Sequence, residues 1–128
     1  MCMDADARLA AAAGGVARFL GDAAGLENDA VARLQSAVIE ACLEAFEHLT
    51  RTHPHLEVTF ARFSDRLEVS LSHENDGPTP GVHTISGFAA NAEELEALAG
   101  VDRVQHETHG NETVTRLTKY LGEVAPNV

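Results

Sequence analysis

The fold is decided by the stretch HLTRTHPHLEVTFARFSDRLEVSLSH, residues 48–73, in which the spacing of apolar residues changes from a helical period to a strand period. Proline keeps the residue before it out of the helical region, so we predict that a helix ends before Pro54. After Pro54, apolar and polar residues alternate, and this pattern predicts two strands joined by the turn FSDR, residues 63–66. The alternating apolar residues are Leu56, Val58 and Phe60 in the first strand and Leu67, Val69 and Leu71 in the second.

Two helices are predicted upstream of this stretch. Residues 29–50 place apolar side chains at steps of three and four, and Asn28 or Asp29 is a suitable N-cap. Residues 8–23 are rich in alanine and also have helical spacing, although the Gly14–Gly15 pair weakens the middle turn. Only a few residues come before this first helix.

A second hairpin is predicted downstream. Residues 73–88 contain Pro, Gly, Asn and Asp with little periodicity and therefore predict a long loop. Residues 92–100 predict a short acidic helix, and residues 101–108 and 112–121 predict two further strands. Strands that pair as hairpins, with helices gathered on one face, define an α+β two-layer sandwich.

The length and composition fit one globular domain. The chain has 128 residues, enough for a single core, and we assign residues 1–7 and 122–128 to tails. Hydrophobic residues make up 45% and charged residues 23%, which is typical of a globular protein. No apolar run is long enough to span a membrane, so we expect no membrane partner.

The chain is strongly acidic. Nine Lys and Arg stand against twenty Asp and Glu, which gives a formal charge of −11. Such a charge repels phosphate backbones, so we expect no nucleic-acid partner and favour a protein partner instead. Cys2 and Cys42 do not form a disulfide framework, and the acidic start is unlike a signal peptide, which together predict a cytoplasmic protein.

The stretch EACLEAFEH, residues 40–48, carries a resemblance to a known family. It resembles the E-A-x-x-N-A-x-x-H helix motif of the bacterial anti-sigma-factor serine kinases, small GHKL proteins with the histidine-kinase-like ATPase fold. Four residues match this motif: Glu40, Ala41, Ala45 and His48.

Two strands extend the resemblance to roughly residues 9–121. DRLEVSLSH, residues 65–73, is similar to the strand that leads into the adenine-binding box, and residues 113–121 are similar to the last strand. The resemblance implies helices packed on a mostly antiparallel sheet of four to five strands. The family's first strand is expected to be missing, because so few residues precede the first helix.

The resemblance assigns roles to individual residues. It implies that Glu40 is the general base and that Glu44 stands where the family has the Asn that helps to hold Mg²⁺, so Glu44 is also the candidate metal ligand. Nucleotide-binding positions fall on Glu44, His48, His73, Asn75, Gly77, Gly87 and Thr118.

Several of these positions depart from the family pattern. The D-x-G of the adenine box falls on His73-Glu74-Asn75, and the G-x-G falls on Ile85-Ser86-Gly87. A protonated histidine has no acceptor for an adenine amino group, and Ile85 places a branched side chain where backbone must approach phosphate. We therefore expect no cofactor, with ATP and Mg²⁺ as the cofactors if the nucleotide site is retained.

Simpler interpretations stand beside these roles. Glu44 and His48 form an ordinary i,i+4 pair, and the line of Glu40, Glu44 and His48 has the composition of a solvated helix face. Seven histidines include His53 and His55, but no recognised zinc spacing is present.

Three functions follow from the sequence. The first is an anti-sigma-factor-like module with a degenerate nucleotide site that binds a sigma factor or an anti-sigma-factor antagonist. The second is an ATP-dependent serine kinase that phosphorylates such an antagonist, and the third is a dimerising scaffold. A homodimer is expected through the first helix and the sheet edge left open by the missing strand.

Overall fold

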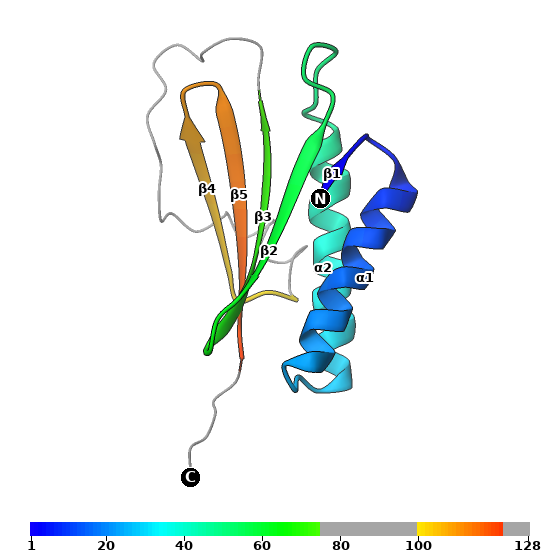
Figure 1. Ribbon diagram of the computed structural model, residues 1–128, viewed down its shortest axis with the longest axis vertical. Coiled ribbons are helices and arrows are strands. Elements are labelled where there is room, and N and C mark those ends of the chain that lie inside the picture. The colour runs from blue at the N-terminus through cyan, green and yellow to red at the C-terminus, as the bar shows by residue number, and fades with distance from the viewer. Residues whose placement is uncertain (75–99, 122–128) are drawn as a thin grey trace.

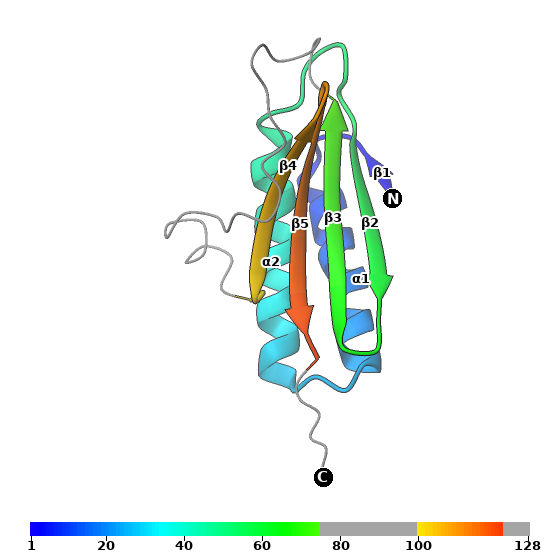
Figure 2. The same cartoon turned by 90° about the vertical axis from the view of Figure 1, so that its left-hand side faces the viewer.

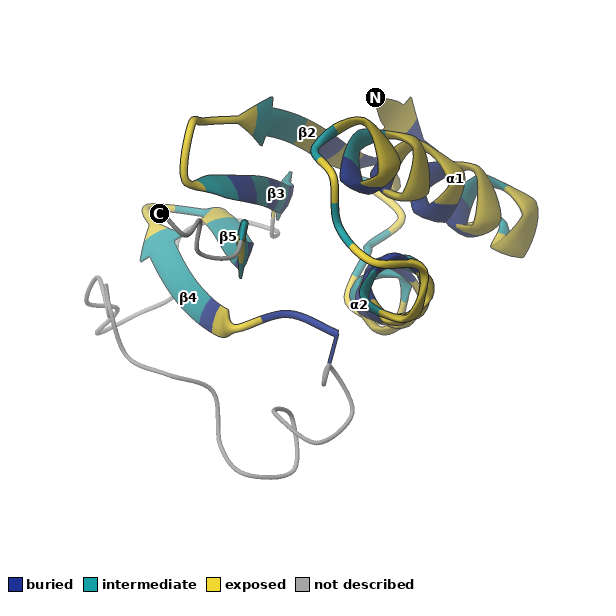
Figure 3. Cartoon of the chain, turned by 90° about the horizontal axis from the view of Figure 1, so that it is seen from below, coloured by how far each residue is buried: buried dark blue, intermediate teal, exposed yellow. Residues whose placement is uncertain are grey.

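The computed structural model describes residues 1–74 and 100–121, and these form two layers (Figure 1). Two helices lie on one side of a curved five-stranded sheet, as the view along the layers in Figure 3 shows. The predicted α+β two-layer sandwich is therefore confirmed. The elements in chain order are β1 (Cys2–Met3), α1 (Ala7–Ala23), α2 (Asn28–Phe46), β2 (Leu56–Arg62), β3 (Arg66–Glu74), β4 (Arg103–His109) and β5 (Glu112–Tyr120).

The sheet is antiparallel throughout the described part of the chain. Its strand order is β1-β2-β3-β5-β4, and Figure 2 shows β2, β3, β5 and β4 side by side. Both predicted hairpins are present, as β2–β3 and as β4–β5. Strand β5 pairs with β3 along its whole length, from Arg66 opposite Tyr120 to Glu74 opposite Glu112, so the two hairpins form one sheet.

The expectation that the first strand is missing was wrong. Cys2 pairs with Glu57 and Met3 pairs with Leu56, so β1 is a two-residue edge strand within the segment that we had assigned to a tail. The Met1 amino group also donates to the Val58 carbonyl, at 2.7 Å. Two residues are too few to show a periodic pattern, and this is why the sequence did not predict the strand.

The helices begin and end close to their predicted positions. Helix α1 is capped by Asp6, whose side chain accepts from the Arg8 backbone N–H. The N-cap of α2 is Glu27, which makes no side-chain capping bond, so the predicted cap at Asn28 or Asp29 was wrong.

Helix α2 ends at Phe46, four residues before the predicted end at Thr50. After Phe46 the backbone forms bonds to the carbonyl three residues back, from Glu47 to Glu44 and from His48 to Ala45. Such bonds tighten a final turn, so the residues up to Thr50 do not continue the α-helix.

The core lies between the helices and the inner face of the sheet. Alternate residues of each strand point toward the helices, which gives the buried set Leu56, Val58, Leu67, Val69, Leu71, Val104 and Leu117. Helix α2 contributes Leu34, Val38, Ala41 and Cys42, and α1 contributes small residues such as Ala10, Ala13 and Ala17. The layers are therefore held together by aliphatic side chains, with small residues where the two helices meet.

Gly100 packs directly against the backbone of α2. A side-chain carbon at this position would overlap the carbonyl group of Arg33 and approach the amide nitrogen of Leu34. Since backbone atoms cannot move aside as a flexible side chain can, glycine is required at this contact. It fixes the chain that leads into β4 against the N-terminal half of α2.

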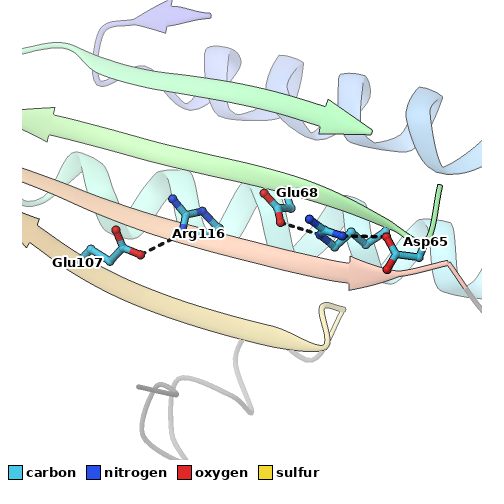
Figure 4. A network of polar contacts seen from close by, with 5 residues as sticks. Asp65, Glu68, Glu107 and Arg116 are labelled. Atoms are coloured by element: carbon cyan, nitrogen blue, oxygen red, sulfur yellow. Dashed lines mark hydrogen bonds and ion pairs between the residues drawn. The ribbon is translucent and has the colours of Figure 1, made fainter. Parts of the chain in front are cut away.

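The outer face of the sheet is polar. Figure 4 shows side chains on the face turned away from the helices. Here Arg116 Nη1 lies 2.9 Å from Glu107 Oε2, and Arg66 Nε lies 2.8 Å from Glu68 Oε2. Both ion pairs are half-buried at the surface of the sheet, and surface ion pairs contribute little stability, about 0–1 kcal/mol each. The residues of β3 to β5 that alternate away from the helices therefore form a polar, solvent-facing side of the sheet.

Some sequence predictions fall outside the described residues. These are most of the loop predicted over residues 73–88, the acidic helix predicted over residues 92–100 apart from Gly100, and the C-terminal tail. Among the described helices, none combines the length and the apolar character that crossing a membrane requires.

Candidate nucleotide site

Glu40 and Glu44 lie one turn apart on α2, and His48 lies two residues beyond its last residue, Phe46. Gln35 and Ile39 of the same helix contact Gly14 of α1. At 100° per residue, Glu40 and Glu44 lie about 100° and 140° around the helix from Ile39, on the flank turned away from α1. All three side chains are exposed. Glu40 and Glu44 therefore lie on an exposed flank of α2, and His48 is exposed just beyond the end of the helix.

His73 lies at the end of β3, on the face of the sheet that points toward the helices. Leu71 and Val69 are buried on this face, and His73 follows them in the same alternation. Its Nδ1 atom is buried and has no hydrogen-bond partner among the described residues. A buried polar atom without a hydrogen-bond partner costs about 1–3 kcal/mol in lost solvation.

The structure brings His48 and His73 together. Their imidazole rings are stacked, with 6.4 Å between the ring centroids and 7° between the ring planes. The two residues are 25 positions apart in sequence (73 minus 48) and were assigned to different parts of the nucleotide site. Their contact places the end of the helix motif against the position of the adenine box.

The surroundings of His73 favour its neutral form. Burial is the largest effect and lowers the pKa of His73 below its usual value; a backbone hydrogen bond involving Glu74 raises it in part, and His48 lowers it again through charge. A neutral imidazole offers one donor and one acceptor, whereas a carboxylate only accepts. The group at this position therefore has a different hydrogen-bonding character from the aspartate of the family motif.

Thr118 lies away from this group. It pairs with Glu68 and Arg103, and it follows the inward-facing Leu117, so its side chain belongs to the outer face of the sheet, where it is 4% exposed. The structure therefore does not bring Thr118 together with Glu40, Glu44 or His73.

The inner face of the second hairpin holds residues that the sequence analysis missed. Thr115 and His106 pair across β5 and β4, and the Thr115 hydroxyl lies 3.1 Å from Nδ1 of His106. Thr113 pairs with His73 and shares its face. Counting back from the apolar Leu117 in steps of two would have selected these threonines in place of Thr118.

A small cavity lies beside His73. It has a volume of about 260 Å³ and is bounded by the loop after α2 and by the ends of the neighbouring strands. His53 from this loop approaches Glu74 at 3.5 Å. Among the described residues, no three His, Cys, Asp or Glu side chains are arranged to hold a metal ion, so Glu44 has no second protein ligand there.

Three of the nucleotide-binding positions predicted from the sequence lie outside the described residues. These are Asn75, Gly77 and Gly87, together with Ile85 of the altered G-x-G. The described part of the site consists of Glu40, Glu44, His48 and His73.

The architecture defines a class of protein before any comparison is made. Two helices on one face of an antiparallel sheet, with a helix motif beside the end of β3, correspond to the histidine-kinase-like ATPase fold.

No family model matches the sequence. The serine-protein kinase RsbW of Bacillus subtilis (strain 168) is 32% identical to the chain over 111 residues, which cover 76% of this chain and 69% of the kinase. The chain belongs to the family of bacterial anti-sigma-factor serine kinases.

Proposed function

We propose that this protein is a regulatory member of its family that binds a protein partner without ATP chemistry. The partner would be a sigma factor or an anti-sigma-factor antagonist. The observation that carries the proposal is the stacked pair of His48 and His73, because it puts an imidazole contact where the family motif would place an aspartate free to meet adenine.

The charge on α2 supports the same proposal. Phosphoryl transfer depends on cations and donors placed around developing negative charge. Glu44 adds a carboxylate at the position of the family's asparagine, and Glu40 lies one turn before it on the same exposed line. Among the described residues neither Glu40 nor Glu44 forms an ion pair with Lys or Arg, and two such carboxylates would repel a triphosphate unless a metal ion joined them.

The composition supports a protein partner. A formal charge of −11 favours association with a basic surface, and the outer face of α1 exposes Phe19 at 71% and Val16 at 37%. Large apolar side chains that are exposed together often mark interaction sites.

The alternative function is the kinase itself. It is favoured by Glu40, which keeps the glutamate of the helix motif, and by the relative, which is a serine-protein kinase. A carboxylate at Glu44 is also an acceptable Mg²⁺ ligand in chemical terms. If the alternative holds, the wild-type protein transfers the γ-phosphoryl group of ATP to a serine of an antagonist protein.

Restoring the family residues tests the proposal. We expect the triple substitution Glu44→Asn, His73→Asp and Ile85→Gly to recover measurable ATP binding in the presence of Mg²⁺, whereas each single substitution should not. Glu47→Asn is the matched control, because it removes one exposed carboxylate at the end of α2, next to the site, without restoring a motif residue. Phosphorylation of an antagonist by the wild-type protein would replace the proposal with the kinase alternative.

We also propose that the protein forms a homodimer through α1 and the neighbouring edge of the sheet. Strand β1 covers only Leu56 and Glu57 of β2, so the edge from Thr59 to Arg62 has no strand beside it in the described part of the chain. Exposed strand edges are usually covered in native proteins. The exposed Phe19 gives α1 an apolar side chain for such an interface.

Sedimentation of the wild type and of two phenylalanine variants tests the dimer. Phe19→Ser should weaken association, and Phe63→Ser should not, because Phe63 is also exposed but lies in the β2–β3 turn against Arg66. A wild type that stays monomeric at high micromolar concentration would refute the dimer and leave the proposal on ATP untouched.

A further inference from the structure

The stacked histidines connect the chain just after α2 with the end of β3. His48 follows the last turn of α2, and His73 is the penultimate residue of β3. His48 is exposed, whereas Nδ1 of His73 is buried without a partner among the described residues. The His48 ring therefore borders solvent, whereas Nδ1 of His73 is shielded from it.

The protonation state of the two rings decides whether the contact is attractive. Two neutral imidazoles, or one neutral and one charged ring, attract each other when stacked. Two charged rings repel each other, and burial adds a desolvation cost for the inner one. A proton on His73 therefore works against both the burial of this residue and its contact with His48.

The titratable residues that line the cavity beside His73 are Cys2 of β1, His53 and His55 of the loop after α2, Glu57 of β2, Glu74 of β3 and Glu112 of β5. Of these, Glu57, Glu74 and Glu112 alternate to the face of the sheet opposite that of His73. His53 lies 3.5 Å from Glu74 and His55 lies 2.7 Å from Asp4, so each loop histidine has a carboxylate within ion-pair distance. The stack differs from these pairs because neither of its rings has a carboxylate partner among the described ion pairs.

We propose that the His48–His73 pair is a proton-controlled clasp that holds the end of α2 on β3 and opens when both rings are protonated. At neutral pH the clasp closes the space in which the helix motif and the adenine-box position meet. In acid the turn after Phe46 and the loop that follows it separate from β3. The clasp itself stands on the geometry of the two rings, and only its effect on the nucleotide site rests on the proposed function.

The sign of the pH dependence follows from the pKa of His73, which burial and then His48 lower in the folded chain. Above the unfolded value of about 6.5 the ring is neutral in both states, and the full stability is present. As the pH falls below about 6.5, the unfolded chain binds the proton first, so stability is lost until the folded pKa is reached. One such proton changes the folding equilibrium by at most about tenfold per pH unit.

Denaturant unfolding between pH 7 and pH 5 tests the clasp with His73→Phe. Phenylalanine keeps an aromatic ring against His48 but binds no proton, so the acid-dependent loss of stability should shrink by the His73 contribution. His53→Gln is the matched control, since His53 lines the same cavity but lies beside Glu74, and this variant should retain the His73 contribution. Parallel pH profiles for the wild type and His73→Phe would overturn the proposal.

A second measurement keeps the test valid if His73→Phe does not fold. His48→Gln changes an exposed side chain, and NMR titration of the imidazole signals then reports on His73 directly. We expect His73 to titrate below the ordinary range in the wild type and closer to it in His48→Gln. Amide protection at His48 and Leu49, corrected for intrinsic exchange, should also fall in acid. An unchanged His73 titration in His48→Gln would refute the clasp, and neither measurement involves ATP.

Discussion

Gly14 and Gly15 form a natural pair of test positions on α1. A side-chain carbon at Gly14 would lie 2.6 Å from Cγ1 and 2.8 Å from Cδ1 of Ile39, whereas one at Gly15 would meet nothing within 4 Å. Both substitutions to alanine gain helix propensity, about 0.5–1 kcal/mol. Only Gly14→Ala also forces Ile39 to move, and overpacking of this kind costs about 1–3 kcal/mol.

The two variants should therefore move in different directions. Gly15→Ala should raise the free energy of unfolding by about 0.5–1 kcal/mol. Gly14→Ala should lie about 1–3 kcal/mol below Gly15→Ala, because the propensity gain is common to both. At about 4 °C per kcal/mol for a chain of this size, thermal unfolding resolves the difference easily. Low protein concentration keeps association through the outer face of α1 from masking it.

A double-mutant cycle with Ile39→Ala identifies the cause. Ile39→Ala removes both atoms that Gly14→Ala would meet, so the cost of the two substitutions together should be smaller than the sum of their separate costs. Equal stabilisation by Gly14→Ala and Gly15→Ala would show that the two helices do not approach closely at Gly14, and the packing of α1 on α2 described here would then be wrong.

Three further predictions concern the core and the sheet. Gly100→Ala should cost more than about 3 kcal/mol in denaturant unfolding, since the new carbon overlaps the backbone of Arg33 and neither chain can yield; a smaller cost would contradict the close approach. Burial raises the pKa of Cys42 to about 11, so iodoacetamide at pH 8 should label only the exposed Cys2 in the native protein and both in denaturant, as mass spectrometry would show. The hydrogen bond from His109, and after it the hydrogen bond from Arg116, lowers the pKa of Glu107. Glu107→Gln should therefore reduce the free energy of unfolding by at most about 1 kcal/mol at pH 7, and this difference should disappear as the pH falls through the lowered pKa.

The period of the apolar residues was sufficient to predict most of the fold. The change at Pro54 gave β2 and β3, and the steps of three and four gave α2, because both patterns reflect burial on one face. Strand β1 was missed, since two residues carry no period. Gly14 was interpreted as a weak point of α1, but it is a contact with Ile39, and contacts between helices depend on tertiary packing that one helix's own pattern does not contain.

The site was predicted only in part. The motif resemblance selected His48 and His73, but nothing in the sequence indicated that their rings would stack or that Nδ1 of His73 would lack a partner. Thr118 was selected from its strand without regard to the side on which it lies, and the alternation starting from Leu117 places it on the outer face. Side-chain direction along a strand follows from the pattern, whereas contacts between elements require the fold.

The measurement that tests the central claim most directly is thermal unfolding of the wild-type protein with increasing ATP and Mg²⁺. A ligand that binds only the folded chain at 100 times its Kd adds about 2.7 kcal/mol, or about 10 °C for a domain of this size. With His73 in place of the aspartate and Glu44 in place of the asparagine, we predict no shift at millimolar ATP, and a clear shift for the variant with all three motif positions restored. A dose-dependent rise for the wild type, with a midpoint in the micromolar range, would contradict the account.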